Sequence, residues 1–152
     1  MSSELVLFCG LQASGKTSFY RARFAATHAH VSKDAWPNAR KKEARQRRLV
    51  DEHLRSGRSV VVDNTNPTQD ERAPLIAIAR GLGARVSCYA FVTSVADAIR
   101  RNAAREGSAR IEDVGIFSVA KRLTEPRLDE GFDELFEVRL TDNGFAVTRQ
   151  IE

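Results

Sequence analysis

Residues 10–17 carry the clearest chemical signal in the chain. Their sequence, Gly-Leu-Gln-Ala-Ser-Gly-Lys-Thr, fits the phosphate-binding pattern G-x-x-x-x-G-K-[ST]. An apolar run precedes the motif and a segment that can be helical follows it, as the motif requires. In that setting backbone amides and the positive end of a helix dipole surround a phosphate. The stretch predicts a nucleotide site made of Gly10, Leu11, Gln12, Ala13, Ser14, Gly15, Lys16 and Thr17.

Lys16 and Thr17 are the two side chains of this loop with distinct chemical roles. Lys16 would reach the β- and γ-phosphate oxygens of a nucleoside triphosphate, and the Thr17 hydroxyl would enter the coordination shell of Mg²⁺. We therefore expect a bound nucleotide and Mg²⁺. The loop leaves the phosphoryl acceptor open, since such loops serve reactions with water, metabolites, proteins and nucleic acids.

Asp34 is a candidate general base. It follows a short strand predicted at residues 28–32, and ligands of open α/β sheets collect at the carboxyl ends of the strands. A carboxylate that faces the γ-phosphate there can accept the proton of an attacking hydroxyl. An aspartate in an ordinary strand-end turn has the same sequence signature, so spacing alone leaves both interpretations open.

A group of arginines, Arg100, Arg101 and Arg105, lies near the end of a helix predicted at residues 95–106. Arg101 and Arg105 are one helical turn apart, so both guanidinium groups can point into one cleft. Over a transferring phosphoryl group they would neutralise charge that develops in the transition state. The alternative is a solvated helix end whose cations interact with the helix dipole.

The rest of the chain alternates between predicted strands and predicted helices. This pattern is typical of a mostly parallel α/β sheet with helices on both faces. Asp142-Asn143-Gly144 predicts a hairpin that returns residues 145–150 antiparallel to the last strand. We expect one domain over residues 1–152, with strands at 5–9, 28–32, 59–63, 84–92 and 132–140 and helices at 18–26, 38–55, 70–81, 95–106 and 111–123.

Composition narrows the functional class. Cys9 and Cys88 each lie in an apolar run and are expected in the core. The sequence shows no signal peptide and no apolar run near the ~20 residues of a membrane span, so we expect a cytoplasmic protein without membrane contacts. Nothing indicates an obligate protein partner. The guanine-selecting string Asn-Lys-x-Asp does not occur, and Asp63 ends its strand without a second acid, which argues against a GTPase and a motor ATPase.

Several strings together match one family. They are the loop at 10–17, Val31-Ser32-Lys33-Asp34, Val61-Val62-Asp63-Asn64-Thr65-Asn66-Pro67, Arg101-Asn102-x-x-Arg105, and Pro126-x-x-x-Glu130-Gly131-Phe132. In order and spacing they resemble the 5′-hydroxyl polynucleotide kinases along most of the chain. The Asp-Asn-Thr-Asn-Pro and Glu-Gly-Phe strings are more particular than the phosphate loop.

The resemblance implies a role for each matched residue. Asp34 would be the general base, and Lys16, Arg101 and Arg105 would stabilise the phosphate that leaves ATP. Thr17 would serve the metal. The resemblance also implies that Asp63 and Asn64 lie on the acceptor side, that the sheet is a P-loop kinase sheet of order 2-3-1-4-5, and that residues 124–127, with Pro126, help to seat the adenine.

One departure concerns the grip on the acceptor strand. The best-known family members follow the general base with an arginine that binds an acceptor phosphate, whereas here Ala35-Trp36-Pro37 occupies that place. Arg40, Lys41 or a base-stacking Trp36 could take over the contact. Lys33 is a further expected acceptor contact. Trp36 fits equally an anchor beneath the next helix. The basic segment at residues 40–48 likewise fits either a nucleic-acid track or a solvated surface.

The sequence therefore supports a kinase that uses ATP and Mg²⁺ to phosphorylate a 5′-hydroxyl end of DNA or RNA. A kinase of a small-molecule hydroxyl, such as a nucleoside, sugar or antibiotic, or of an aminoacyl-tRNA, is the alternative. A nucleotide-dependent binding module without transfer is a third possibility. The chain lacks the Asp-x-Asp-x-Thr signature of a phosphatase module.

Overall fold

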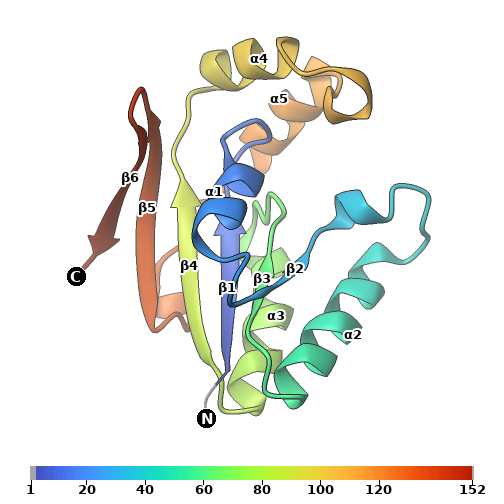
Figure 1. Ribbon diagram of the computed structural model, residues 1–152, viewed down its shortest axis with the longest axis vertical. Coiled ribbons are helices and arrows are strands. Elements are labelled where there is room, and N and C mark those ends of the chain that lie inside the picture. The colour runs from blue at the N-terminus through green and yellow to red at the C-terminus, as the bar shows by residue number, and fades with distance from the viewer. Residues whose placement is uncertain (1–2, 152) are drawn as a thin grey trace.

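A six-stranded sheet of order β2-β3-β1-β4-β5-β6 runs through the middle of the protein (Figure 1). The computed structural model describes residues 3–151. Neighbouring strands are parallel except β5 and β6, which form the antiparallel hairpin expected around residues 142–144. The sheet confirms the predicted order 2-3-1-4-5. Its strands are β1 (Glu4–Cys9), β2 (Ala29–Val31), β3 (Val60–Val62), β4 (Arg85–Phe91), β5 (Glu134–Thr141) and β6 (Gly144–Gln150).

Helices cover both faces of this sheet, which explains the unbroken apolar runs of the central strands. All three valines of β3 are fully buried. The α-helices are α1 (Lys16–Arg23), α2 (Lys42–Arg55), α3 (Gln69–Gly81), α4 (Val95–Ala103) and α5 (Asp113–Arg122), and the short 3₁₀ turns are η1 (Lys33–Ala35), η2 (Gly107–Ala109) and η3 (Leu128–Glu130).

Three helix starts differ from the sequence-based expectation by two residues or more, those of α1, α2 and α5, and α5 begins at Asp113 and not at residue 111. Helix α4 ends at Ala103, three residues earlier than expected, so Arg105 lies outside it. Helix α1 begins at Lys16, two residues earlier than expected, because the phosphate loop turns directly into it. Helix α2 begins at Lys42 and not at Asn38. The chain before it forms η1 and further turns, and Lys41 adopts a left-handed conformation with φ 55°. The start of α4 at Val95 is as expected, and Ser94 caps the helix, since its Oγ accepts from the Asp97 backbone N at 3.0 Å.

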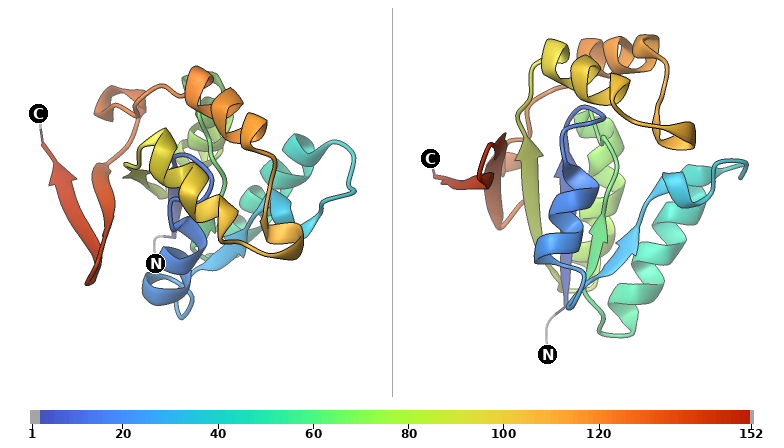
Figure 2. Two further views of the ribbon diagram at one scale, coloured as in Figure 1. Left: turned by 90° about the horizontal axis from the view of Figure 1, so that it is seen from above. Right: turned by 45° about the horizontal axis from the view of Figure 1, so that its top comes forward.

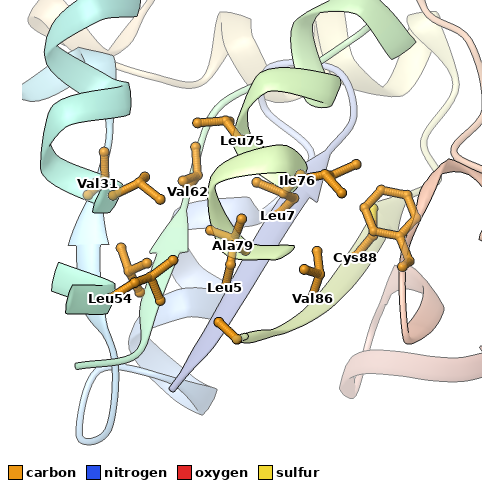
Figure 3. Close-up of a cluster of buried hydrophobic side chains, with 14 of the residues drawn as sticks. Leu5, Leu7, Val31, Leu54, Val62, Leu75, Ile76, Ala79, Val86 and Cys88 are labelled. Atoms are coloured by element: carbon orange, nitrogen blue, oxygen red, sulfur yellow. The ribbon is translucent and has the colours of Figure 1, made fainter. Parts of the chain in front are cut away.

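The two faces of the sheet carry different cores. On one face, side chains of β1, β3 and β4 pack against α2 and α3, as Figure 3 shows. Both cysteines are free and belong to this aliphatic layer, as expected. On the other face Phe8 meets Phe19 of α1 and Phe91 of β4 with ring centroids 5.8 and 5.0 Å away. This aromatic layer holds α1, and hence the start of the phosphate loop's helix, against β1.

Helices α4 and α5 lie across the carboxyl ends of the strands (Figure 2). A small apolar cluster joins Ala98 of α4 with Ile116 and Val119 of α5, and Leu11 of the phosphate loop is its fourth buried member. The two helices therefore rest directly on the loop that would hold phosphate. Within residues 3–151, no helix combines the length and apolar character needed to cross a bilayer.

Candidate active site

The phosphate loop follows β1 and is fixed by backbone contacts. The Gly10 backbone N donates to Thr65 O at 3.0 Å. A Cβ at Gly10 would lie 2.7 Å from the carbonyl oxygen of Phe91, so a side chain there would displace the loop. Gly15 caps α1 with φ 93°, and the Phe145 ring of β6 lies 3.0 Å from where its Cβ would be. Gly10 is thus required by the space around it, and Gly15 by its left-handed backbone conformation.

Lys16 lies almost fully buried over this loop. Its Nζ donates to Gly10 O at 3.0 Å and to Leu11 O at 2.5 Å. Burial lowers the pKa of Lys16 to about 8. The positive charge of Arg105 also lowers this pKa, whereas the negative charges of Asp63 and Asp34 raise it. Four ionisable side chains from four different elements therefore interact electrostatically at one place.

Thr17 and Asp63 form the polar floor of the site. The Thr17 hydroxyl donates to Asp63 Oδ2 at 2.7 Å, and the carboxylate is almost fully buried. A hydroxyl that donates its proton keeps its lone pairs for a cation. Mg²⁺ binds hard oxygen atoms and typically uses one or two protein ligands together with phosphates and water. The pair fits that ion, and no cluster of three or more acidic, histidine or cysteine ligands occurs among residues 3–151.

The Asp63 carboxylate is almost fully buried and is turned inward to Thr17. A contact between Asp63 and an acceptor therefore stays a prediction. Asn64 is also occupied within the protein. Its Oδ1 accepts from the Lys33 backbone N at 3.0 Å, and its Nδ2 donates to Gln46 Oε1. The geometry favours a role for Asn64 in holding the turn that carries Asp34.

Asp34 lies in η1, directly after β2, and is exposed. Its backbone N donates to Ser32 Oγ at 3.2 Å, which fixes the turn. Its carboxylate accepts no hydrogen bond from the described part of the chain. The carboxylate nevertheless raises the pKa of Lys16, so it lies within electrostatic reach of the phosphate loop. This is the placement that a base acting on an incoming acceptor needs.

The three predicted arginines, Arg100, Arg101 and Arg105 (the lid arginines), have separate environments. Arg105 follows α4 and donates to Ala109 O at 3.2 Å, and its charge reaches Lys16. Arg101 Nη1 donates to Thr93 Oγ1 at 3.0 Å. Arg100 is exposed and pairs with Asp97 at 2.8 Å. The structure therefore brings Arg105 to the site, ties Arg101 to the start of its own helix, and leaves Arg100 in solvent.

The predicted acceptor contacts lie around η1. Trp36 is partly buried against the aliphatic core, and the Arg45 guanidinium lies 4.7 Å from its ring centroid. These contacts fit the anchor interpretation, because one ring face is already covered. Lys33 pairs with Glu43, whereas Arg40 is exposed and makes no ion pair among the described residues.

The loop predicted to seat adenine is tied to the α3 side of the protein. The Thr124 backbone N donates to Pro67 O at 2.7 Å. Thr124 also accepts from the fully buried Arg72, whose guanidinium pairs with Glu130 at 2.9 Å. The element that lies against Gly15 is instead the β5–β6 hairpin. A nucleotide contact by Pro126 therefore stays a prediction.

Three functional candidates were missed in the sequence. Arg72 is a fully buried cation in α3, Gln46 is a buried amide in the basic segment, and His30 contacts Asp63 from β2. Glu130 was noted only as part of a string. A signal existed for Gln46, since it is the one polar uncharged residue of the basic segment at residues 40–48. For His30 and Arg72 the partner is distant in sequence, so no local pattern marks the contact.

Comparison with known proteins defines the family. A family model described as an AAA domain matches residues 5–125, which include the phosphate loop, both strand-end aspartates and the lid arginines. The chain belongs to this AAA-domain family. The chain is also 27% identical over 139 residues to the bifunctional polynucleotide phosphatase/kinase of Schizosaccharomyces pombe. That alignment covers 89% of this chain and 33% of the yeast protein, so the chain spans one third of that relative's length.

Solved structures share the fold of this AAA domain. Kti12 from Chaetomium thermophilum, in complex with ADP-AlF3, superposes with a TM-score of 0.74 at 21% identity, over 91% of this chain and 90% of that one. A gluconokinase from Sinorhizobium meliloti gives a TM-score of 0.61 at 19% identity, over 90% and 82% of the two chains. At these identities the similarity shows a common fold.

Proposed function

We propose that the protein is an ATP- and Mg²⁺-dependent kinase that transfers the γ-phosphoryl group to a 5′-hydroxyl end of a nucleic acid. The observation that carries this proposal is the parallel strand order β2-β3-β1, in which Asp34, Asp63 and the phosphate loop each follow the carboxyl end of one of three neighbouring strands. A nucleotide-binding module would need the loop, Lys16 and Thr17. It would have no use for an exposed carboxylate held within reach of the phosphates.

The donor would bind on the amides of residues 10–17, with Lys16 turned to the β- and γ-phosphates. Mg²⁺, held by Thr17 and Asp63, supplies positive charge to the phosphate oxygens when bound. Asp34 accepts the proton as the acceptor oxygen attacks the γ-phosphorus in line. The bond from that phosphorus to the bridging oxygen breaks, and ADP leaves. Arg105 and Lys16 stabilise the charge that builds on the transferred group.

Two observations favour a nucleic acid as the acceptor. The first is the sequence similarity to a polynucleotide phosphatase/kinase over most of this chain. The second is the positive charge of the segment that follows η1 in the chain. Several cations of the segment after η1 have no carboxylate within ion-pair distance among residues 3–151, and cations of this kind bind phosphate backbones. They are Arg40, Lys41, Lys42 and Arg47.

Transfer from γ-labelled ATP to a single-stranded oligonucleotide with a 5′-hydroxyl tests the proposal. We expect labelled product with this oligonucleotide and none with the same strand carrying a 5′-phosphate. For three phosphate contacts, raising salt from ~50 to ~200 mM should weaken binding about 20-fold. Label on gluconate and on neither strand would instead support the small-molecule alternative, which the fold shared with a gluconokinase keeps in view.

A further inference from the structure

His30 contacts the site but has no role in the chemistry described so far. It lies in the middle of β2, and its Nε2 is 2.8 Å from Asp63 Oδ2. Thr17 donates to the same oxygen. Since an ionised carboxylate only accepts hydrogen bonds, the proton of the imidazole lies on Nε2 in this contact. One carboxylate oxygen therefore receives two donors.

The His30 ring is itself held in place. Tyr20 of α1 stacks on it with centroids 4.2 Å apart and ring planes 22° apart. The Tyr20 hydroxyl donates to His28 O at 2.6 Å, which fixes the stacking ring from its other end. Tyr20 follows Thr17 by three residues and thus lies on the same side of α1. The contacts form one continuous chain from Tyr20 through His30 and Asp63 to Thr17.

This chain restricts the carboxylate of Asp63. With Thr17 as its only donor, the carboxylate could rotate and still keep a hydrogen bond. Two donors on Oδ2 hold one orientation, and Oδ1 accepts nothing from the residues that the structure describes. Groups that orient metal-binding side chains typically contribute 10- to 100-fold to metal affinity.

We propose that His30 is a positioning residue for Mg²⁺. It holds Asp63 in the orientation in which the carboxylate and the Thr17 hydroxyl receive the ion together with the nucleotide. The inference rests on the proposed function for the binding of nucleotide and Mg²⁺, and it does not depend on which acceptor is phosphorylated.

Calorimetric titration of ADP in the presence and absence of Mg²⁺ tests this role without any transfer reaction. In the wild-type protein Mg²⁺ should strengthen ADP binding. In His30→Ala this gain should shrink about 10- to 100-fold, while binding of metal-free ADP stays unchanged. His30→Gln, whose amide Nε2 can donate to Asp63, should recover much of the gain. His53→Ala, on α2, is the matched control and should behave like the wild type.

Two outcomes would overturn the proposal and leave the proposed function standing. A full Mg²⁺-dependent gain in His30→Ala would show that Asp63 needs no second donor. If His30→Ala weakened ADP binding equally with and without Mg²⁺, His30 would support the phosphate loop and not the metal. If the wild-type protein bound no ADP in either condition, the proposed function would fail and this inference with it.

Discussion

On the donor side of the site the polar side chains are buried and bonded to one another, whereas on the acceptor side they lie in solvent. Lys16, Thr17 and Asp63 make five hydrogen bonds to the loop or to neighbouring side chains within a nearly closed floor. Asp34 and Arg40 are exposed. A polyphosphate donor would therefore meet side chains that are already bonded in place, whereas an acceptor would meet side chains that lie in solvent.

The largest effect should come from Arg105, whose charge acts on Lys16 of the donor side. Arg105→Ala should lower the transfer rate by ~10³-fold or more, because arginines over a transferring phosphoryl group contribute on that scale. Arg100→Ala, which removes an exposed arginine from the helix that precedes Arg105, should leave the rate within about twofold. Single-turnover transfer measures both. Equal losses of transfer rate in the two variants would mean that Arg105 acts through the overall positive charge of this region and not through a contact in the site.

The acceptor side is tested by Asp34→Asn. Loss of the base should lower transfer by ~10²- to 10⁴-fold. ADP affinity should be unchanged, since the Asp34 carboxylate has no bond to the loop. Asp70→Asn, another exposed aspartate at the start of a helix, is the control. If Asp34→Asn weakened ADP binding as strongly as transfer, Asp34 would belong to the donor side and the contrast drawn above would be wrong.

Arg72 tests whether the buried side of the site is a structural unit. It donates to Asn66 O at 2.9 Å and pairs with Glu130, so it links the turn after β3 with the loop after α5. Arg72→Met leaves a buried carboxylate without its partner, which should lower the free energy of unfolding by about 3–5 kcal/mol. Urea unfolding measures this change.

An exposed ion pair provides the control for Arg72. Arg85 and Glu134 are 2.8 Å apart, with half of the Arg85 side chain in solvent. Arg85→Met should lower the free energy of unfolding by less than about 1 kcal/mol. Similar losses in both variants would mean that burial does not set the strength of these pairs here.

The low pKa of Lys16 predicts a pH-dependent donor site. Below pH 8 the free protein carries the charge on Lys16, and above pH 8 Lys16 must take up a proton to meet the phosphates. ADP affinity should therefore fall as the pH rises above 8, by at most about tenfold per pH unit. Titrations in two buffers of different ionisation enthalpy should detect proton uptake at high pH and none at pH ~6.5.

A cation that stays charged distinguishes this cause from a general effect of pH. Lys16→Arg keeps its charge throughout the range, so its ADP affinity, although altered, should not vary with pH between 7 and 10. A falling affinity in that variant would assign the pH dependence to another group.

The smallest effect should come from single charges on the acceptor side. Replacing Arg40 and Arg47 by glutamine should weaken oligonucleotide binding several-fold at low salt and lower the salt slope by about 0.7 per lost contact. Arg21 and Lys121, replaced in the same way, are the control pair on other surfaces. Fluorescence anisotropy reports both, and an unchanged slope in the first pair would separate the basic segment from the acceptor.

How far the sequence predicts the site depends on how local each interaction is. The phosphate loop and the position of Asp34 follow from strings of adjacent residues, whereas the strand order is implied by the family resemblance, and the structure is consistent with each. The inward turn of Asp63 could not be predicted in the same way. It depends on Thr17 and His30, which lie 46 and 33 residues away in sequence and meet it only after the sheet has formed.

The start of α2 is a second case. A proline followed by an asparagine predicted a helix at Asn38, but the chain needs residues 33–41 to carry η1 away from the sheet before α2 can return along it. The length of this connection depends on η1, which carries Asp34 after β2, and helix propensities of the residues do not reveal it. Local rules thus predict the elements well and the length of the connection poorly.

Leu11 has a consequence for how the protein could respond to its ligands. It is part of the phosphate loop and also a buried member of the cluster that joins α4 to α5. A shift of those helices must therefore move Leu11, and with it the amides that would hold the donor. By thermodynamic reciprocity, a nucleotide that selects one shape of the loop selects one placement of Arg105 as well. Nucleotide binding to the phosphate loop and the movement of Arg105 toward that loop would then be coupled in one equilibrium.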